Sequence, residues 1–432
     1  MAHYEDFVPA GTHSNSRIRG GRPVVATRAW GSRILDERGR ELLDFIMGNG
    51  AVILGHAAPE VVDAVKECVQ NGLTTGVESL LALQAADALR SLIPEPGMVR
   101  FANTGTEAIL HCLDIARAAT GRANFAKAEG AYHGWAAPMN VSTWPAADRW
   151  GPPDRPSTVP GSGGLDPASS ATVVFPFNNL AATEQVLRDR SGDIAAVWVE
   201  PVLIDIGYVP AEREYLQGLR ELTQEIGSLL IFDETLTGFR IARGGAREHY
   251  GVHADLTVYG KAIANGYPLA AVEGAAQLME LTNPLRGGKV GFVGTYNGHG
   301  VCAAAALAAL DRLRDPATLA KLDSLTQQLA ERVAEVAAKS DLPVRFAGGG
   351  GHFQIYFTDI PVIDYRSAST SDVARYRSFV EACDREGIVY PDVPLSHAAL
   401  STAHTSEDIE RLVGALRIAV GMGTSPQARR RG

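Results

Sequence analysis

The sequence predicts an α/β protein, with a mainly parallel central sheet in a large domain and a smaller α+β domain beside it. The first observation is an alternation, between about residues 56 and 300, of short apolar runs such as 194–199 with helix-like stretches such as 212–226. Strands that alternate with helices favour a parallel sheet covered by helices. The second observation is size, because 432 residues with 46% hydrophobic content can form one large core and a second domain.

The N-terminal third of the chain begins with an arm. Residues 1–55 are expected to form this arm and part of the small domain, and within them residues 31–44 hold two short apolar runs around a charged turn, which predicts a hairpin. Residues 56–300 then form the large domain.

The C-terminal part is richer in helix. Residues 301–424 are expected to complete the small domain, with alanine- and leucine-rich helices at 301–313 and 316–338 and a last helix capped by Ser406–Asp408. Residues 425–432 are polar and basic, which is typical of a disordered tail.

Composition and charge limit the classes of partner that we expect this protein to bind. The net charge of −9 gives no reason to expect nucleic acid or an anionic membrane, and no apolar stretch is long enough to span a bilayer. The N-terminus lacks a secretory pattern and the four cysteines are scattered, so we expect a cytoplasmic protein with reduced thiols. The histidines show no metal spacing, and no metal is predicted.

Lys261 and Asp233 are the first candidate site residues. Each follows a short apolar run that reads as a buried strand, and ligands bind at the carboxyl ends of such strands. A pyridoxal 5'-phosphate (PLP) enzyme needs a lysine amine to form a Schiff base with the aldehyde and a carboxylate to keep the pyridine nitrogen protonated. Taken alone, a lysine in the position of Lys261 is more commonly a solvated strand-end residue, and an aspartate in the position of Asp233 is more commonly a helix cap.

Three further segments carry polar groups suited to the same ligand. Gly105 and Thr106 lie where an apolar run ends and a helical pattern begins, a place where unpaired N–H groups can hold a phosphate, although an ordinary helix cap explains the segment as well. Tyr132 and His133 stand in a glycine-flanked turn, where an aromatic ring can lie against a planar ligand. Thr295 adds a hydroxyl in a glycine-rich segment.

Taken together, these segments resemble the class III aminotransferases of fold type I PLP-dependent transferases, and most closely their glutamate-1-semialdehyde 2,1-aminomutase-like branch. The resemblance covers nearly the whole chain. It is carried by the motifs at 104–108, 132–134, 199–202, 232–240, 255–261 and 403–405.

The resemblance implies a role for each candidate. Lys261 is expected to hold the cofactor as a Schiff base and to act as general base, with Asp233 against the pyridine nitrogen and Tyr132 stacked on the ring. Thr295 is expected to reach the phosphate in the other subunit, which implies a homodimer with shared active sites. The remaining cofactor contacts are expected from Gly105, Thr106, His133, Glu200, Asp205 and Thr235.

Substrate binding is expected from the N-terminal arm. Relatives that handle β- or γ-positioned amino acids carry an arginine at the place of Arg17, where it binds the substrate carboxylate, and Ser14 lies beside it. A surface arginine on a loose arm remains the alternative. Residues 144–170 are rich in Pro, Gly and Ser, and the resemblance makes them a loop that covers the active site.

Departures from the family pattern bear on the reaction. Thr235 replaces a usual valine, Asp205 replaces a usual asparagine, His299-Gly300 replaces Asn-Pro, and the aminomutase's glutamate near Ser396 is not evident. We therefore expect an aminotransferase that moves an amino group from an amino acid donor to a carboxylate-bearing carbonyl acceptor. A glutamate-1-semialdehyde aminomutase, another PLP-dependent isomerase, and a binding protein that has lost catalysis are the alternatives.

Overall fold

The computed structural model describes residues 4–72, 76–161 and 171–422. The chain forms two compact units. The large unit contains residues 59–320 and 362–368, and the small unit contains the rest of the chain. The tail predicted at 425–432 lies outside the described residues. Within the described residues, no helix combines the length and the apolar character needed to cross a membrane.

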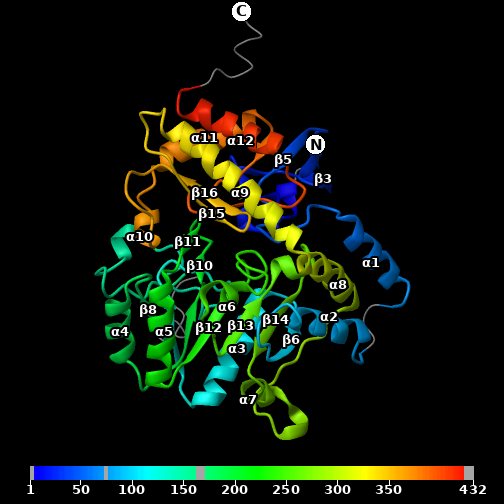
Figure 1. Cartoon of the computed structure of the whole chain (residues 1–432), viewed down its shortest axis with the longest axis vertical. Coiled ribbons are helices and arrows are strands. Elements are labelled where there is room, and N and C mark those ends of the chain that lie inside the picture. Colours follow the sequence, from blue (N-terminus) through cyan, green and yellow to red (C-terminus); the bar gives the residue numbers. More distant parts are fainter. Residues whose placement is uncertain (1–3, 73–75, 162–170, 423–432) are drawn as a thin grey trace, which may run out of the picture. The chain divides into compact units, whose positions relative to one another are not determined.

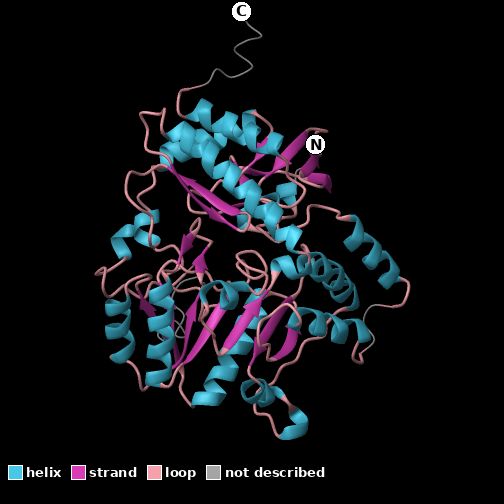
Figure 2. Cartoon of the chain, in the orientation of Figure 1, coloured by secondary structure: helices cyan, strands magenta, loops and turns pink. Residues whose placement is uncertain are grey.

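A seven-stranded sheet forms the centre of the large unit (Figures 1 and 2). Its strands, in spatial order, are β6 (Met98–Ala102), β14 (Ala270–Gly274), β13 (Leu256–Tyr259), β12 (Leu229–Glu234), β9 (Ile194–Val199), β7 (Asn124–Ala128) and β8 (Thr172–Phe175). Only β14 runs antiparallel to its neighbours in this sheet, so the prediction of a mainly parallel sheet is confirmed.

The order of the strands sets the place of the site. The chain passes from β7 outward to β8 and then returns to the other side of β7 as β9, so the direction of winding switches between β7 and β9. Open α/β sheets bind ligands outside the carboxyl ends of strands at such a switch point. Because β6, β7, β9, β12 and β13 point the same way, their carboxyl ends lie along one edge of the sheet.

Helices cover the sheet because their apolar faces need burial. Helix α3 (Gly105–Thr120) packs on the strands from β6 to β9, and its Ile109 and Leu113 join Phe125 and Trp198 in the main core. The other helices of this unit are α1 (Pro59–Val69), α2 (Leu80–Arg90), α4 (Leu180–Arg188), α5 (Arg213–Ile226), α6 (Gly245–Tyr250), α7 (Ala276–Met279), α8 (Gly300–Arg314) and α10 (Tyr365–Ala368).

Two expectations for the C-terminal part need correction. The small domain was expected to begin at residue 301, but α8 packs against α1 and α2, so residues 300–314 belong to the large unit. An alanine-rich helix gives no sign in the sequence of which unit it will contact. The last helix, α12 (Ser406–Ala419), is capped by Thr405 instead of Ser406, because the Thr405 hydroxyl accepts from the Asp408 N–H.

The small unit contains two small sheets. The predicted hairpin is confirmed as β4 (Arg33–Asp36) and β5 (Glu41–Asp44), which join β3 (Ala26–Trp30) and β17 (Ile388–Val389). The second sheet contains β15 (Arg345–Gly349), β16 (His352–Tyr356) and β18 (Ala398–Ala399). Helices α11 (Val373–Arg385) and α12 pack together in the small unit. Helix α9 (Pro316–Ala337) has its first turn, up to residue 320, in the large unit and the rest of its residues in the small unit.

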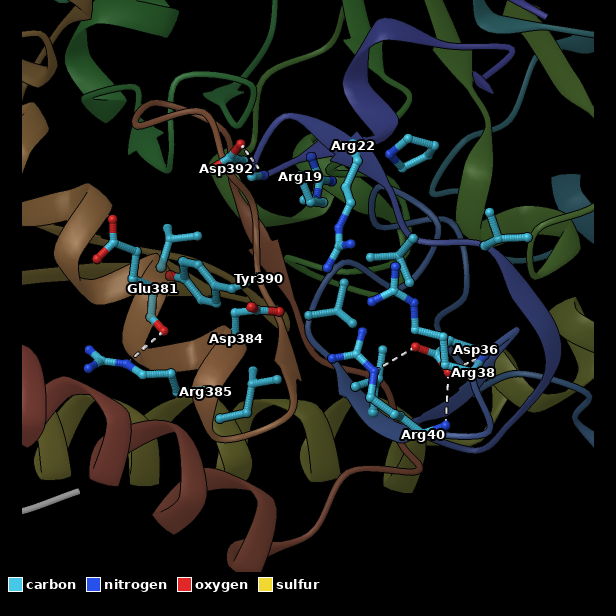
Figure 3. A pocket seen from close by; sticks show the side chains of 18 of the residues that line it. Arg19, Arg22, Asp36, Arg38, Arg40, Glu381, Asp384, Arg385, Tyr390 and Asp392 are labelled. Carbon is cyan, nitrogen blue, oxygen red and sulfur yellow. Dashed lines mark hydrogen bonds and ion pairs between the residues drawn. The ribbon is translucent and has the colours of Figure 1, made fainter. Parts of the chain in front are cut away.

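A cavity of about 590 Å³ opens in the small unit (Figure 3). Arg22, Arg38 and Arg40 lie on one wall, and Glu381 and Asp384 lie on the opposite wall. Charges of both signs therefore face this space, and none of the residues predicted for the site lines it.

Candidate active site

A second cavity, of about 160 Å³, lies at the carboxyl ends of the large sheet. It brings together nearly every residue that the sequence predicts as a cofactor contact, from strands that are far apart in the chain. They are Gly105, Thr106, Tyr132, His133, Glu200, Asp205, Asp233, Thr235 and Lys261. Ile109, Gly134 and Leu236 complete the lining.

Asp233 is held by three hydrogen bonds at the end of β12. His133 Nδ1 lies 2.8 Å from Asp233 Oδ2, and the backbone N–H and hydroxyl of Thr235 donate to Asp233 Oδ1 over 3.0 and 2.6 Å. The carboxylate is almost fully buried. A buried charge needs partners, and these donors keep Asp233 in one orientation toward the cavity.

His133 follows Tyr132 in the same turn, and its side chain is buried. A carboxylate only accepts hydrogen bonds, so His133 donates to Asp233 through Nδ1. Burial lowers the pKa of His133, although the contact with Asp233 opposes this effect. The second ring nitrogen, Nε2, has no protein partner among the described residues.

Lys261 follows β13 and begins the short 3-10 helix Lys261–Ala264. Its backbone has a φ of 49°, which is uncommon for a residue with a Cβ. Burial lowers the pKa of the Lys261 ammonium, while Asp205, Asp233 and Glu200 oppose the change. A lowered pKa increases the share of neutral amine, which is the form that attacks an aldehyde.

Glu200 fixes the turn that presents Tyr132. Its carboxylate accepts hydrogen bonds from the backbone N–H of Tyr132, over 3.0 Å, and of Ile204, over 3.3 Å. Burial raises the pKa of Glu200 well above its usual value, and the nearby Asp205 and Asp233 add to the rise. Tyr132 stacks on Trp144 with ring centres 5.8 Å apart and an angle of 8° between the planes.

The start of α3 forms a cradle with the 132–134 turn. Thr104 caps the helix by accepting from the Glu107 N–H, and the Glu107 carboxylate accepts from the N–H of Asn103, the residue before the cap. The first N–H groups of a helix lack intrahelical acceptors and favour an anion. A Cβ on Gly134 would lie 2.4 Å from Thr106 Oγ1, so glycine lets the turn approach the helix this closely.

Lys127 is a buried residue that the sequence did not reveal. Its ammonium donates to the carbonyl oxygens of Ala131 (2.7 Å) and Val141 (2.6 Å) and to the Thr143 hydroxyl (3.0 Å). Burial lowers the pKa of Lys127 to about 7. The side chain thus ties together both ends of the segment that carries Tyr132 and His133.

Three predicted residues do not line the cavity. Thr295 is exposed on the 291–299 segment of the large unit. Ser14 and Arg17 belong to the small unit, where the Ser14 hydroxyl lies 3.0 Å from that of Ser16 and Arg17 is exposed. Their predicted roles stay predictions.

Comparison with known proteins gives the family. The family model for class-III aminotransferases matches residues 17–392. The chain belongs to the class III aminotransferases. It is 36% identical over 418 residues to glutamate-1-semialdehyde 2,1-aminomutase 2 of Brevibacillus brevis, an alignment that covers 96% of each chain.

Two solved transaminase structures are similar to this chain in both fold and sequence. An omega-transaminase from Sphaerobacter thermophilus superposes with a TM-score of 0.90 at 33% identity, covering 96% of this chain and 95% of its own. A transaminase with PLP bound gives a TM-score of 0.86 at 30% identity, with the same coverage. The fold is that of the fold type I PLP-dependent transferases, as predicted.

The class III enzyme described here uses PLP and acts on small molecules. When bound, PLP supplies an aldehyde for the substrate amine and a ring that withdraws electrons from it. The cavity fits this group. In such a fit the buried carboxylate of Asp233 would face the ring nitrogen, the amine of Lys261 would meet the aldehyde, and the α3 cradle would hold the phosphate.

Proposed function

We propose that this protein is an aminotransferase that moves an amino group between an amino acid donor and a carboxylate-bearing carbonyl acceptor. The observation that carries the proposal is the meeting of Lys261 and Asp233 in one cavity. In this proposal Lys261 Nζ would hold the cofactor and, as general base, would move a proton at the substrate carbon. Asp233, held by His133 and Thr235, keeps a negative charge against the ring nitrogen.

An aminomutase is the second candidate, and the names of relatives such as the one from Brevibacillus brevis favour it. Three sequence departures favour the transfer reaction instead: Asp205 in place of asparagine, His299-Gly300 in place of Asn-Pro, and the missing glutamate near Ser396. An aminomutase must retain and reorient its intermediate, and it depends on its own loop and acidic residue to do so. The likeness to an omega-transaminase agrees with the transfer reaction.

A homodimer is part of the proposal. Thr295 lies on an exposed segment outside the cavity, which agrees with a contact to the phosphate in a second subunit. Gly298, in the same segment, lies close to Ala82 of α2, where an added Cβ would be 3.0 Å from the Ala82 Cβ. The exposed apolar side chains near these two positions in the sequence are Val77, Leu80, Leu83, Val293 and Tyr296. Exposed apolar surface, where it is contiguous, typically marks a protein interface.

Arg17 and Ser14 are proposed to bind the substrate carboxylate. Arg17 is exposed and its guanidinium has the planar geometry that binds a carboxylate through two hydrogen bonds. The cytoplasm is the proposed location, supported by four cysteines that are all free and buried.

The visible absorption spectrum tests the reaction. The purified protein is loaded with PLP and mixed with one amino donor at a time, beginning with glutamate, alanine and β-amino acids. An aminotransferase is expected to pass into the pyridoxamine form with one donor and to return when a separate carbonyl acceptor is added. A single substrate that is isomerised with no net change of cofactor form would instead identify an aminomutase.

A further inference from the structure

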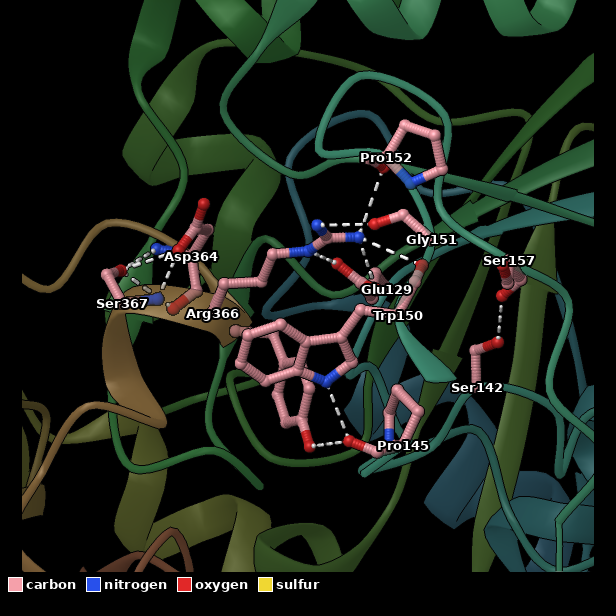
Figure 4. A network of polar contacts seen from close by, with 11 residues as sticks. Glu129, Ser142, Pro145, Trp150, Gly151, Pro152, Ser157, Asp364, Arg366 and Ser367 are labelled. Atoms are coloured by element: carbon pink, nitrogen blue, oxygen red, sulfur yellow. Dashed lines mark hydrogen bonds and ion pairs between the residues drawn. The ribbon is translucent and has the colours of Figure 1, made fainter. Parts of the chain in front are cut away.

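The loop of residues 144–152 lies next to the candidate active site and is held by α10. Helix α10 belongs to residues 362–368, which join the large unit although the chain on both sides of them belongs to the small unit. Two neighbouring residues of α10, Tyr365 and Arg366, make the contacts. Figure 4 shows those of Arg366. Residues 162–170, which belong to the predicted covering loop 144–170, lie outside the described residues.

Arg366 forms a buried ion pair with Glu129. Its Nε and Nη2 donate to the two carboxylate oxygens of Glu129 over 2.7 and 3.0 Å (Figure 4). The exposed fractions of the two side chains are 16% and 5%. A two-point contact of this kind fixes the plane of the guanidinium. Glu129 follows directly after β7 and precedes the turn with Tyr132, so the arginine is anchored to the strand that carries the site.

The same guanidinium binds the backbone of the loop. It donates to the carbonyl oxygens of Trp150 and Gly151 over 3.0 Å each and of Pro152 over 3.2 Å (Figure 4). It also lies over the Trp150 ring, 5.3 Å from the centre. One cation therefore donates hydrogen bonds to three consecutive carbonyl groups. This part of the loop has little freedom to move independently of Arg366.

Pro145 is the second point of attachment. Its carbonyl oxygen accepts from the Tyr365 hydroxyl and from Trp150 Nε1, each over 2.8 Å. Trp144, the residue before it, has a φ of 53°, a left-handed conformation that is costly for a bulky side chain. Such a conformation persists when the surroundings determine it, and here the flanking carbonyl is held by two donors.

Trp144 is the link to the cavity. Its ring lies parallel to that of Tyr132, at an angle of 8°, and Tyr132 lines the cavity. The two rings pack against each other with centres 5.8 Å apart, so the position of Trp144 bounds one side of the space that the Tyr132 ring occupies. The orientation of Tyr132 therefore depends on where the loop holds Trp144.

We propose that Arg366 and Tyr365 are positioning residues for the cofactor: by holding the 144–152 loop they keep Trp144 against Tyr132 and so set the surface on which the cofactor ring lies. The inference rests on the proposed place of the ring against Tyr132. It does not depend on whether the enzyme transfers or isomerises the amino group.

Cofactor affinity and the visible circular dichroism of bound PLP test the proposal. The variants are Arg366→Met, Tyr365→Phe and Trp144→Ala, each compared with the parent after removal and titration of PLP. A distant substitution that misplaces a reacting group can lower the reaction rate on the order of 100-fold. We expect Arg366→Met and Trp144→Ala each to raise the Kd for PLP about 10-fold and to weaken the dichroism, since the asymmetric surface around the ring is lost.

Arg155→Met is the matched control, because Arg155 lies close by in the chain but pairs with Asp189 at the exposed surface. It should leave both readouts unchanged. The double variant Arg366→Met/Trp144→Ala should be no worse than the more severe single variant, because both changes act through one contact. Effects that multiply, or an Arg366→Met protein that melts earlier but keeps the parental Kd and dichroism, would overturn the proposal.

Tyr365→Phe keeps the test decisive if Arg366→Met does not fold, because it removes one hydroxyl and leaves the ion pair intact. A smaller change in the same direction supports the proposal, and a parental Kd and dichroism contradict it. Measurements on the parent protein distinguish this proposal from the proposed aminotransferase reaction. A parent that binds PLP but transfers no amino group contradicts the proposed reaction alone, and the variants can still be compared.

Discussion

His133 Nδ1 lies 2.8 Å from Asp233 Oδ2, and both side chains are buried at the edge of the large sheet. His133 thus orients the carboxylate proposed to face the pyridine nitrogen. We expect His133→Leu to weaken PLP binding and lower kcat by about 10- to 100-fold, as changes behind a ligating group often do. His133→Asn, whose amide can replace the Nδ1 donor, should recover part of the loss. Equal effects of the two variants would show that the hydrogen bond is unimportant. His249→Asn, at an exposed histidine, is the control.

Lys261→Ala should abolish turnover while leaving the protein folded, because no other amine among the described residues lines the cavity. Lys261→Arg keeps the positive charge but cannot attack the aldehyde, and it should be equally inactive. Asp233→Asn should still bind PLP and lower kcat by about 100-fold or more, a magnitude typical of a lost acid–base group. Single-turnover absorption changes with one donor measure both effects. Full activity in any of the three variants contradicts the assignment.

Gly134→Ala tests the cradle at the start of α3. The new Cβ would lie 2.4 Å from Thr106 Oγ1, and the φ of 88° is strained for alanine. Gly121→Ala shares the strain, with a φ of 70°, but its Cβ meets no atom within 4 Å. Both variants should lose about 1–2 kcal/mol of stability. Only Gly134→Ala should also bind PLP more weakly, as measured by titration of the cofactor-free protein. Similar PLP affinities in the two variants would argue against the cradle.

Arg17→Ala should raise KM for substrates that carry a carboxylate and leave amines without one unaffected. A hydrogen bond to a charged group contributes about 1.5–3 kcal/mol, which corresponds to roughly a 10- to 100-fold change in KM. Arg22→Ala, at a second exposed arginine of the N-terminal segment, is the control. If Arg17→Ala affects both kinds of amine alike, Arg17 does not bind the carboxylate.

Glu234 predicts a dependence of stability on pH. Burial raises its pKa to about 8 from the ordinary 4.5. Between these values the folded state holds a proton that the unfolded state has lost, so stability falls as the pH rises through this window and no further above it. Relative to Glu234→Gln, the wild type should lose at least about 1.4 kcal/mol between pH 5 and pH 9, the equivalent of one pKa unit. Parallel melting curves for the two proteins across this range would contradict the shift.

Much of the site could be predicted because its residues follow recognisable local patterns. Asp233 and Lys261 each end an apolar run, and the structure brings them to one edge because β12 and β13 are parallel neighbours. Thr104 caps α3 through the Glu107 N–H, as the spacing of the two residues indicates.

The contacts that were missed depend on distance in the chain. Glu129 and Arg366 pair across 237 positions, and neither lies in a pattern that predicts a partner. The bond between His133 and Asp233 spans 100 positions. A buried lysine such as Lys127 also escapes prediction, because the sequence does not show that four carbonyl or hydroxyl oxygens will surround it.

Residues 362–368 have a consequence for how this enzyme can be recombined with its relatives. A gene segment that encodes residues 59–320 specifies all seven strands of the sheet, yet it lacks Arg366. In such a fragment Glu129 would be a buried carboxylate without its cation, which is strongly destabilising. A chimera that exchanges the large unit must therefore transplant two separate stretches of sequence with four junctions, and a single-block exchange is expected to give insoluble protein.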